Sequence, residues 1–174
     1  DTPARTWTDA FGDELARITA DTLTIGGANT TGITVDGVTE ANVTNINTVV
    51  LDATRDDSQI TFNGSASTFK ALTANADDGI IVDRNLTVTT GEMRLDGDAD
   101  NAADTNDQLN IADAITLSSE PMGGDITLRA ATGGVTADGS LIVNSNADII
   151  LGSSISSPSS LALNANGSII LEAA

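Results

Sequence analysis

The chain has 174 residues, which is enough for one domain with a buried core. It carries 25 acidic residues against 7 basic ones, a formal net charge of -18, and this balance argues against nucleic acid or anionic lipid as a partner. Histidine, cysteine and tyrosine are absent. Zinc sites built from cysteine and histidine, disulfides, thiol nucleophiles and histidine acid–base chemistry are therefore excluded.

The apolar residues are mostly aliphatic. Hydrophobic residues make up 40% of the chain and aromatic residues only 2%, so we expect a core of alanine, valine, isoleucine and leucine. No apolar run approaches the roughly 18 residues of a membrane span, and no membrane insertion is expected. The start at Asp1-Thr2-Pro3 resembles the mature terminus of a processed protein or a trimmed chain. The absence of cysteine, together with the many Asp, Asn, Gly, Ser and Thr residues, predicts an extracellular, cell-surface or virion-surface structural protein.

Residues 1–20 differ in pattern from the rest of the chain and form the first predicted unit. Four apolar residues recur at spacings of four, four and three, which places them on one helix face: Trp7, Phe11, Leu15 and Ile18. The spacing predicts an α-helix over residues 7–20. Two interpretations remain open for it. The helix covers the first exposed layer of the following domain, or it docks on a neighbouring subunit.

Residues 21–174 form the second predicted unit, and their pattern has period two in very short pieces. Such alternation is typical of strands with one buried face. An aliphatic–Thr–apolar triplet occurs six times, beginning at Leu23, Ile33, Ile60, Leu86, Ile115 and Ile126. Gly, Asn, Asp and Ser lie between the pieces and favour turns. Strands this short cannot stand alone, so we expect them to stack.

The C-terminal region contains an internal repeat. Residues 140–151 (SLIVNSNADIIL) and 160–171 (SLALNANGSIIL) share seven identities in twelve positions at an offset of 20. Looser recurrences at offsets of 22 or 23 connect Leu86 with Leu109, Met93 with Ile115, and Ile126 with Ile149.

This period predicts an all-β fold, a parallel β-helix (β-solenoid) of about seven coils with the short N-terminal helix. Each coil cannot bury its inner face alone, so neighbouring coils stack about 4.8 Å apart and share one aliphatic core. The competing architecture is an antiparallel β-sandwich, whose strands are usually longer and joined by hairpins.

The C-terminal half resembles a known family. The segments Gly124-Asp125-Ile126-Thr127-Leu128-Arg129-Ala130 and Gly167-Ser168-Ile169-Ile170-Leu171-Glu172-Ala173 are similar to the repeats of filamentous-haemagglutinin-type adhesins. The resemblance implies a right-handed parallel β-helix secreted by bacteria, with an exposed adhesive or structural role. The secretion motif of that family, Asn-Pro-Asn-Gly, is missing from this chain. Viral tail fibres and tailspikes share the same general features.

One motif indicates metal chemistry. Residues 96–107 read DGDADNAADTND, and acidic residues occupy positions 1, 3, 5, 9 and 12 of the segment, the ligand spacing of an EF-hand calcium loop. The predicted calcium ligands are Asp96, Asp98, Asp100, Asp104 and Asp107. Position 6 is Asn101 rather than Gly, and position 12 is Asp rather than Glu. The alternative is a solvated, Asp-rich turn.

Catalysis is not expected. Five further aspartates offer carboxylate pairs of the kind used in polysaccharide cleavage: Asp56, Asp57, Asp77, Asp78 and Asp83. Solvated turn residues are the simpler interpretation of them, and we predict that the chain is not an enzyme. A polysaccharide-acting β-helix enzyme is the least favoured alternative.

The C-terminal strand suggests self-assembly. It ends in Ser168-Ile169-Ile170-Leu171-Glu172 with no capping helix or proline, and an open strand edge can pair with another chain. We therefore expect an extracellular structural subunit that stacks head to tail into a filament or adhesive fibre. The predicted assembly interface is Trp7, Phe11, Leu15, Ile18, Ile169 and Leu171. The expected partners are further copies of the chain and, secondarily, a surface polysaccharide. The alternatives are a viral tail fibre or decoration protein and a fragment of a large secreted adhesin.

Overall fold

The computed structural model describes residues 5–8 and 15–172, and nearly all of its regular structure is β-strand. The strands form three sheets, A, B and C, in which every strand pair is parallel. Sheet A contains β1 (Arg5–Thr8), β3 (Gly32–Asp36), β5 (Gln59–Asn63), β8 (Ile80–Val82), β11 (Leu109–Ile111), β14 (Val135–Ala137) and β17 (Ile155–Ser156). Sheet B contains β2 (Ala20–Gly26), β4 (Ile46–Ala53), β7 (Leu72–Ala76), β10 (Met93–Asp96), β13 (Ile126–Arg129), β16 (Ile149–Leu151) and β19 (Ile169–Leu171). Sheet C contains β6 (Ser67–Phe69), β9 (Leu86–Val88), β12 (Ile115–Ser119), β15 (Leu141–Ser145) and β18 (Leu161–Ala165).

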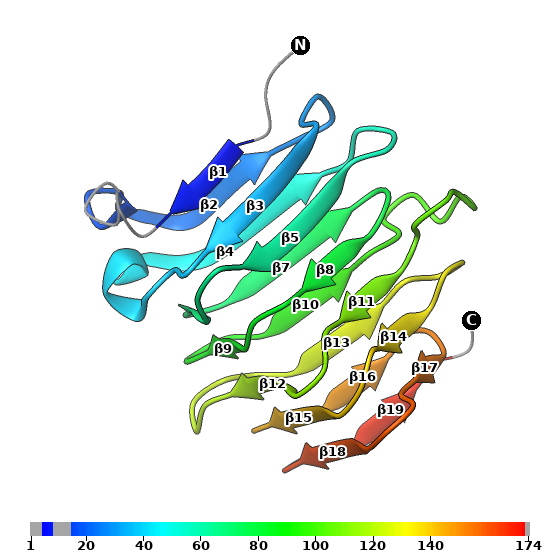
Figure 1. Ribbon diagram of the computed structural model, residues 1–174. Coiled ribbons are helices and arrows are strands. Elements are labelled where there is room, and N and C mark those ends of the chain that lie inside the picture. The colour runs from blue at the N-terminus through cyan, green and yellow to red at the C-terminus, as the bar shows by residue number, and fades with distance from the viewer. Residues whose placement is uncertain (1–4, 9–14, 173–174) are drawn as a thin grey trace.

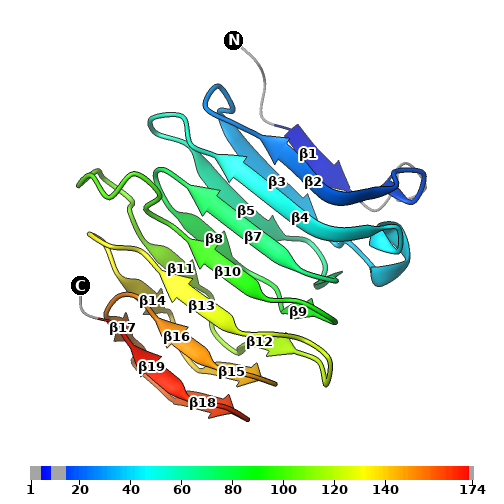
Figure 2. The same ribbon diagram turned by 180° about the vertical axis from the view of Figure 1, so that it is seen from behind.

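From β5 onward the chain visits the sheets in the fixed order A, C, B. We call one such passage a coil. Each strand pairs with its counterparts in the preceding and following coils, so the coils stack along one axis. Figures 1 and 2 show β1 and β2 at one end of the stack and β17, β18 and β19 at the other. The arrangement is all-β and compatible with a parallel β-helix.

The first two coils have no strand in sheet C among the described residues. In the second coil its place is taken by a short 3-10 helix, η2 (Glu40–Val43), which follows β3. The residue Val38, just before η2, accepts a hydrogen bond from the Thr68 N–H at 2.7 Å and donates its own N–H to the Ser67 hydroxyl at 3.1 Å. This segment therefore covers the edge of β6, where sheet C begins.

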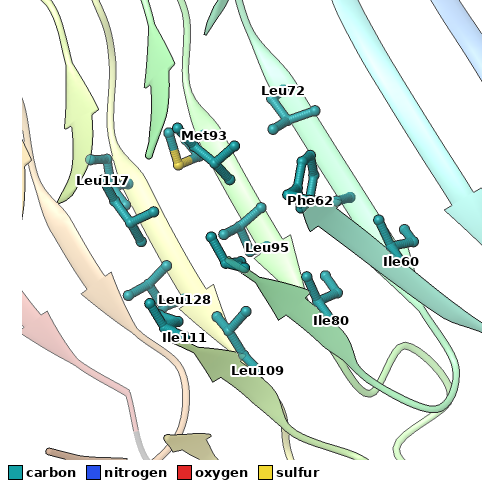
Figure 3. Close-up of a cluster of buried hydrophobic side chains, with 14 of the residues drawn as sticks. Ile60, Phe62, Leu72, Ile80, Met93, Leu95, Leu109, Ile111, Leu117 and Leu128 are labelled. Atoms are coloured by element: carbon teal, nitrogen blue, oxygen red, sulfur yellow. The ribbon is translucent and has the colours of Figure 1, made fainter. Parts of the chain in front are cut away.

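The core follows directly from the alternation seen in the sequence. All six Thr-centred triplets lie in strands, and in five of them the two flanking apolar residues are buried while the threonine is half-buried. Aliphatic side chains from successive coils, with Phe62 and Phe69, form one continuous core. Figure 3 shows part of it, in which Phe62, Leu72, Leu95 and Leu128 come from different strands.

The 20-residue repeat is confirmed as a stack of two coils. Leu141 is paired with Leu161 and Ile149 with Ile169, so identical sequence positions occupy identical structural positions. The identical asparagines form ladders: Asn164 Nδ2 donates to Asn144 Oδ1 at 2.9 Å, and Asn166 Nδ2 donates to Asn146 Oδ1 at 3.1 Å. The repeat therefore reflects both the shared core and these side-chain contacts.

Two of the three looser recurrences are wrong, because the residues that they connect are not stacked in neighbouring coils. The offset that connects Ile126 with Ile149 is confirmed. However, Leu109 is paired with Ile80 rather than stacked on Leu86, and Met93 is paired with Ile126 rather than with Ile115. The cause is the acidic segment after β10, which lengthens one coil and shifts everything that follows it.

The N-terminal helix predicted over residues 7–20 is wrong at both ends. Trp7 belongs to β1, which pairs with β3, and Ala20 begins β2. Residues 16 and 17 form a turn. Thr-Trp-Thr in β1 has little helix preference and favours strands, so pairing with an available sheet edge outweighs the local spacing. Residues 9–14, including Phe11, lie outside the described residues.

Candidate functional site

Aspartates gather where the chain leaves sheet B and enters sheet A. Strands β4, β7 and β10 are in register, with Ala53 opposite Ala76 and Asp96 opposite Asn75. The loops that follow these strands are therefore stacked on one another. We call this set of loops the acidic corner. It comprises residues 54–58, 77–79 and 97–108 together with Asp96. The longest loop, after β10, extends beyond its neighbours (Figure 1).

In the part of the chain that the structure describes, ion pairs are seen at Asp96. Its Oδ2 lies 2.6 Å from the Arg94 guanidinium and 3.5 Å from that of Arg129 on the next coil. Burial raises the pKa of Asp96, and the two arginines counter part of that rise. Arg129 also donates to the side-chain oxygen of Asn101, whose backbone has a φ of 59°. Asn101 thus adopts the left-handed conformation that an EF-hand loop assigns to glycine.

Asp98 and Asp107 meet at one residue of the following coil, Thr132. The Thr132 N–H donates to Asp98 Oδ2 at 2.6 Å, and the Thr132 hydroxyl donates to Asp107 Oδ2 at 3.0 Å. Asp98 is fully buried and Asp107 is 3% exposed. The other oxygen of each carboxylate, Oδ1, is buried without a hydrogen-bond partner.

Asp104 joins two aspartates from earlier coils instead. Carboxylate oxygens of Asp56, Asp77 and Asp104 all lie within 4.8 Å of one another. Burial raises the pKa of Asp77, and the nearby charge of Asp100 raises it further. The pKa of Asp104 is also raised, by loss of solvent and then by Asp107 and Asp100. This set of three carboxylates is a second place in the acidic corner where a cation could bind.

The remaining predicted carboxylates have other roles. Asp100 is exposed, and its Oδ1 accepts the Ala102 N–H at 2.8 Å. Asp78 is buried and bound by both the backbone and the side chain of Asn106 at 3.0 Å. Asp83 follows β8 and lies away from the acidic corner, between sheets A and C. The five aspartates of the predicted calcium loop are thus divided among four local environments.

The distances among Asp56, Asp77 and Asp104 suit a shared cation. One carboxylate oxygen of each residue lies within 4.8 Å of the others. Carboxylates this close can share a cation or a proton.

The sequence placed Asp56 and Asp77 among the candidate carboxylate pairs and Asp104 in the predicted calcium loop. They are far apart in the chain, and they meet only because their loops follow strands of sheet B that are in register. The signal that was available is the spacing from Asp56 to Asp77, which is close to the length of one coil. The role of Thr132 had no such signal, since it carries no charge and lies outside the acidic segment.

A second candidate site is the end of the stack formed by the last coil. Inward-facing residues of β19 are exposed, whereas their partners in β16, one coil earlier, are buried. Ile169 is 48% exposed and Ile149 0%, and Leu171 is 74% exposed and Leu151 3%. The edges of β17, β18 and β19 have no further strand beside them in the described residues. We call this surface the C-terminal end face.

The opposite end of the stack is partly covered. Leu15 and Ile18 are half-buried and pack against the chain's own core. A small apolar cavity of about 20 Å³ lies beneath them, lined by Leu15, Leu23, Ile25, Val35, Val38, Val43, Val49, Leu51 and Phe69. Of the predicted assembly residues, Leu15 and Ile18 thus contribute to an end cover. Trp7 lies in the edge strand β1, and Phe11 is outside the described residues.

Comparisons of the chain with protein-family models, curated proteins and solved structures found no match. Within the described part of the chain, no helix has the length and apolar character needed to cross a membrane. Inferences about function therefore rest on the acidic corner and the C-terminal end face.

Proposed function

We propose that this chain is a parallel β-helix that serves as a non-catalytic structural subunit, extended by head-to-tail stacking into an extracellular filament or adhesive fibre. The observation that carries the proposal is the exposure of Ile169 and Leu171, which occupy core positions of the repeat. Stacked coils bury such residues against the next coil, so the C-terminal end face is complementary to another coil.

The proposed junction continues sheets A and B. Strand β19 would pair with β2 of the next copy, and β17 with β1, because β1 and β2 are the edge strands at the opposite end. Leu23 and Ile25 of β2 are half-buried and offer apolar side chains to that contact. This contact is heterologous and does not close, so repetition gives a linear polymer.

Two other structural roles share this end face. In a large adhesin of the filamentous-haemagglutinin type, further coils of the same polypeptide would cover it. In a viral tail fibre or decoration protein, a virion component would do so. In all three roles the end face would be buried in the assembled structure, and the roles differ in which chain covers it.

Electron microscopy of the native material, combined with intact-mass measurement, tests the proposal. We expect linear filaments one stack wide, built from chains of 17.6 kDa. A mature chain of much larger mass would assign the cover to the protein's own further coils. Particles attached to capsids or tails would assign it to a virion. Either result contradicts the homopolymer.

Turnover assays provide the matching test of the non-catalytic role. We expect the purified chain to release no products from pectin, alginate or capsular polysaccharide. If products do appear, the change Asp77→Asn shows whether Asp56, Asp77 and Asp104 are responsible. Loss of turnover in that variant would replace the structural role with a polysaccharide-cleaving one.

A further inference from the structure

Among the described residues, the buried carboxylates of Asp98 and Asp107 form no ion pair with a positively charged side chain. Both side chains are at least 97% buried, and each has one oxygen without a partner. Burial of a carboxylate is costly unless it is paired with a cation or fully hydrogen-bonded. Arg94 and Arg129 are already bound by Asp96.

The atoms around the pair are hard oxygen donors. Thr132 Oγ1 lies 3.0 Å from Asp107 Oδ2 and 3.4 Å from the backbone carbonyl of Ala102. Ala102 is position 7 of the EF-hand-like segment, the position that supplies a carbonyl ligand. Thr132 thus contacts both carboxylates and lies beside the Ala102 carbonyl. Hydrogen bonds from water would give the two Oδ1 atoms partners, but they would leave two negative charges uncompensated.

We propose that Asp98, Asp107, Thr132 and the carbonyl of Ala102 form a calcium site that clamps the long loop after β10 to the next coil. Calcium takes six to eight oxygen ligands in flexible geometry, and water completes such a set. Magnesium demands a tighter octahedron and loses its water reluctantly, so it suits this site poorly. The site uses two of the five aspartates suggested by the loop spacing, and its third side chain comes from a different coil.

The calcium site is independent of the proposed stacking, because it lies on the side of the coils rather than at the end face. Its test therefore uses the chain at concentrations where light scattering shows monomers. Thermal unfolding is followed by circular dichroism in EDTA, in about 10 mM calcium and in magnesium at equal ionic strength. For a Kd of about 0.1 mM, calcium should raise Tm by roughly 5 to 10 °C, and magnesium should raise it much less.

Asparagine substitutions locate the ion. Asp98→Asn and Asp107→Asn keep the shape of the side chain and an acceptor for Thr132, so both variants should fold. We expect each to lose most of the calcium shift and to weaken calcium binding at least about tenfold by calorimetry. The matched control is Asp113→Asn, outside the acidic corner. Asp104→Asn tests the other cluster of carboxylates, with Asp56 and Asp77, and it should keep most of the shift if the ion lies at Asp98 and Asp107.

A pair of variants at Thr132 tests the hydroxyl ligand. Thr132→Ser keeps Oγ and should bind calcium like the original chain, whereas Thr132→Val keeps the N–H but loses the hydroxyl and should bind more weakly. Three results would overturn the proposal. They are no calcium shift in the original chain, equal shifts with magnesium and in all variants (diffuse charge screening), and loss of the shift in Asp104→Asn alone.

Discussion

The C-terminal end face and the acidic corner each reverse the usual placement of side chains, in opposite senses. The end face exposes apolar Ile169, and the corner buries charged Asp98. Comparable residues elsewhere in the chain have suitable neighbours. Ile149, one coil earlier, is covered by the next strand, and Asp96 is paired with Arg94. The difference lies in the neighbours and not in the residue type.

Among the described residues, the end face lacks an apolar neighbour, and the buried carboxylates of Asp98 and Asp107 lack a cation. An exposed patch of core residues is complementary to more apolar surface, and a buried unpaired carboxylate is complementary to a cation. The proposed partner is therefore another protein surface at the end face and a metal ion at the acidic corner. The energetic effect of a substitution at either region should depend on whether the proposed partner is present.

The largest difference in stability is expected when each of two stacked isoleucines is replaced by aspartate. Ile149→Asp buries an unpaired carboxylate in the core and should destabilise the chain by more than about 4 kcal/mol, enough to unfold it or nearly so. Ile169→Asp, one coil later, should cost less than about 1 kcal/mol in dilute solution because Ile169 is exposed. Urea unfolding of both variants measures the difference. Similar losses in both would mean that the end face is already covered in the monomer.

Substitutions of two aspartates in the acidic corner should change the stability of the chain by smaller amounts and in opposite directions. Asp96→Ala leaves Arg94 and Arg129 without their partner and should cost about 1 to 3 kcal/mol, given that both arginines are about one-third exposed. Asp98→Asn in EDTA removes an uncompensated charge and should raise stability by about 1 kcal/mol.

Urea unfolding in EDTA measures both variants against the original chain. A loss of stability in Asp98→Asn comparable to that in Asp96→Ala would mean that the Asp98 carboxylate is already compensated. In calcium the sign for Asp98→Asn should reverse, since the variant then lacks the bound ion.

The smallest expected effect is a dependence of stability on pH through Asp77. Its pKa in the folded state is raised above the ordinary value of 3.8, mainly by burial. The folded chain therefore holds this proton more readily than the unfolded chain, and the contribution of Asp77 to stability falls as pH rises from 3.8 through the raised pKa. Without calcium, Tm should increase on acidification from neutral pH towards that window.

The variant Asp77→Asn isolates this contribution, because it cannot titrate. Its Tm should change less between neutral and mildly acidic pH than that of the original chain. The control is Asp113→Asn, which changes an aspartate outside the acidic corner. An equal flattening in both variants would attribute the pH dependence to net charge alone.

Strand positions and core residues were predictable, because alternation along a strand is a local signal. Each triplet such as Ile60-Thr61-Phe62 carries its own burial pattern, and the structure confirms it. The 20-residue repeat also fixed the stacking of Ile149 on Ile169. These features need no knowledge of distant parts of the chain.

The features that failed depend on contacts between distant segments. The long loop after β10 changes the length of one coil, so Met93 pairs with Ile126 instead of a residue 22 positions away. The helix predicted near Trp7 gave way to pairing of β1 with β3. The meeting of Asp98 and Asp107 at Thr132 depends on which loops become neighbours after stacking. None of these contacts is encoded in a local spacing.

Sedimentation velocity over a wide concentration range tests whether the C-terminal end face stacks on another copy of the chain. We expect a mass that grows with concentration for the original chain, and a constant 17.6 kDa for Ile169→Asp. The matched control, Ile142→Asp, alters an isoleucine of similar exposure (40%) on the outside of β15 and should assemble like the original chain. Monomers of the original chain at every concentration, or equal loss of assembly in both variants, would rule out this stacking.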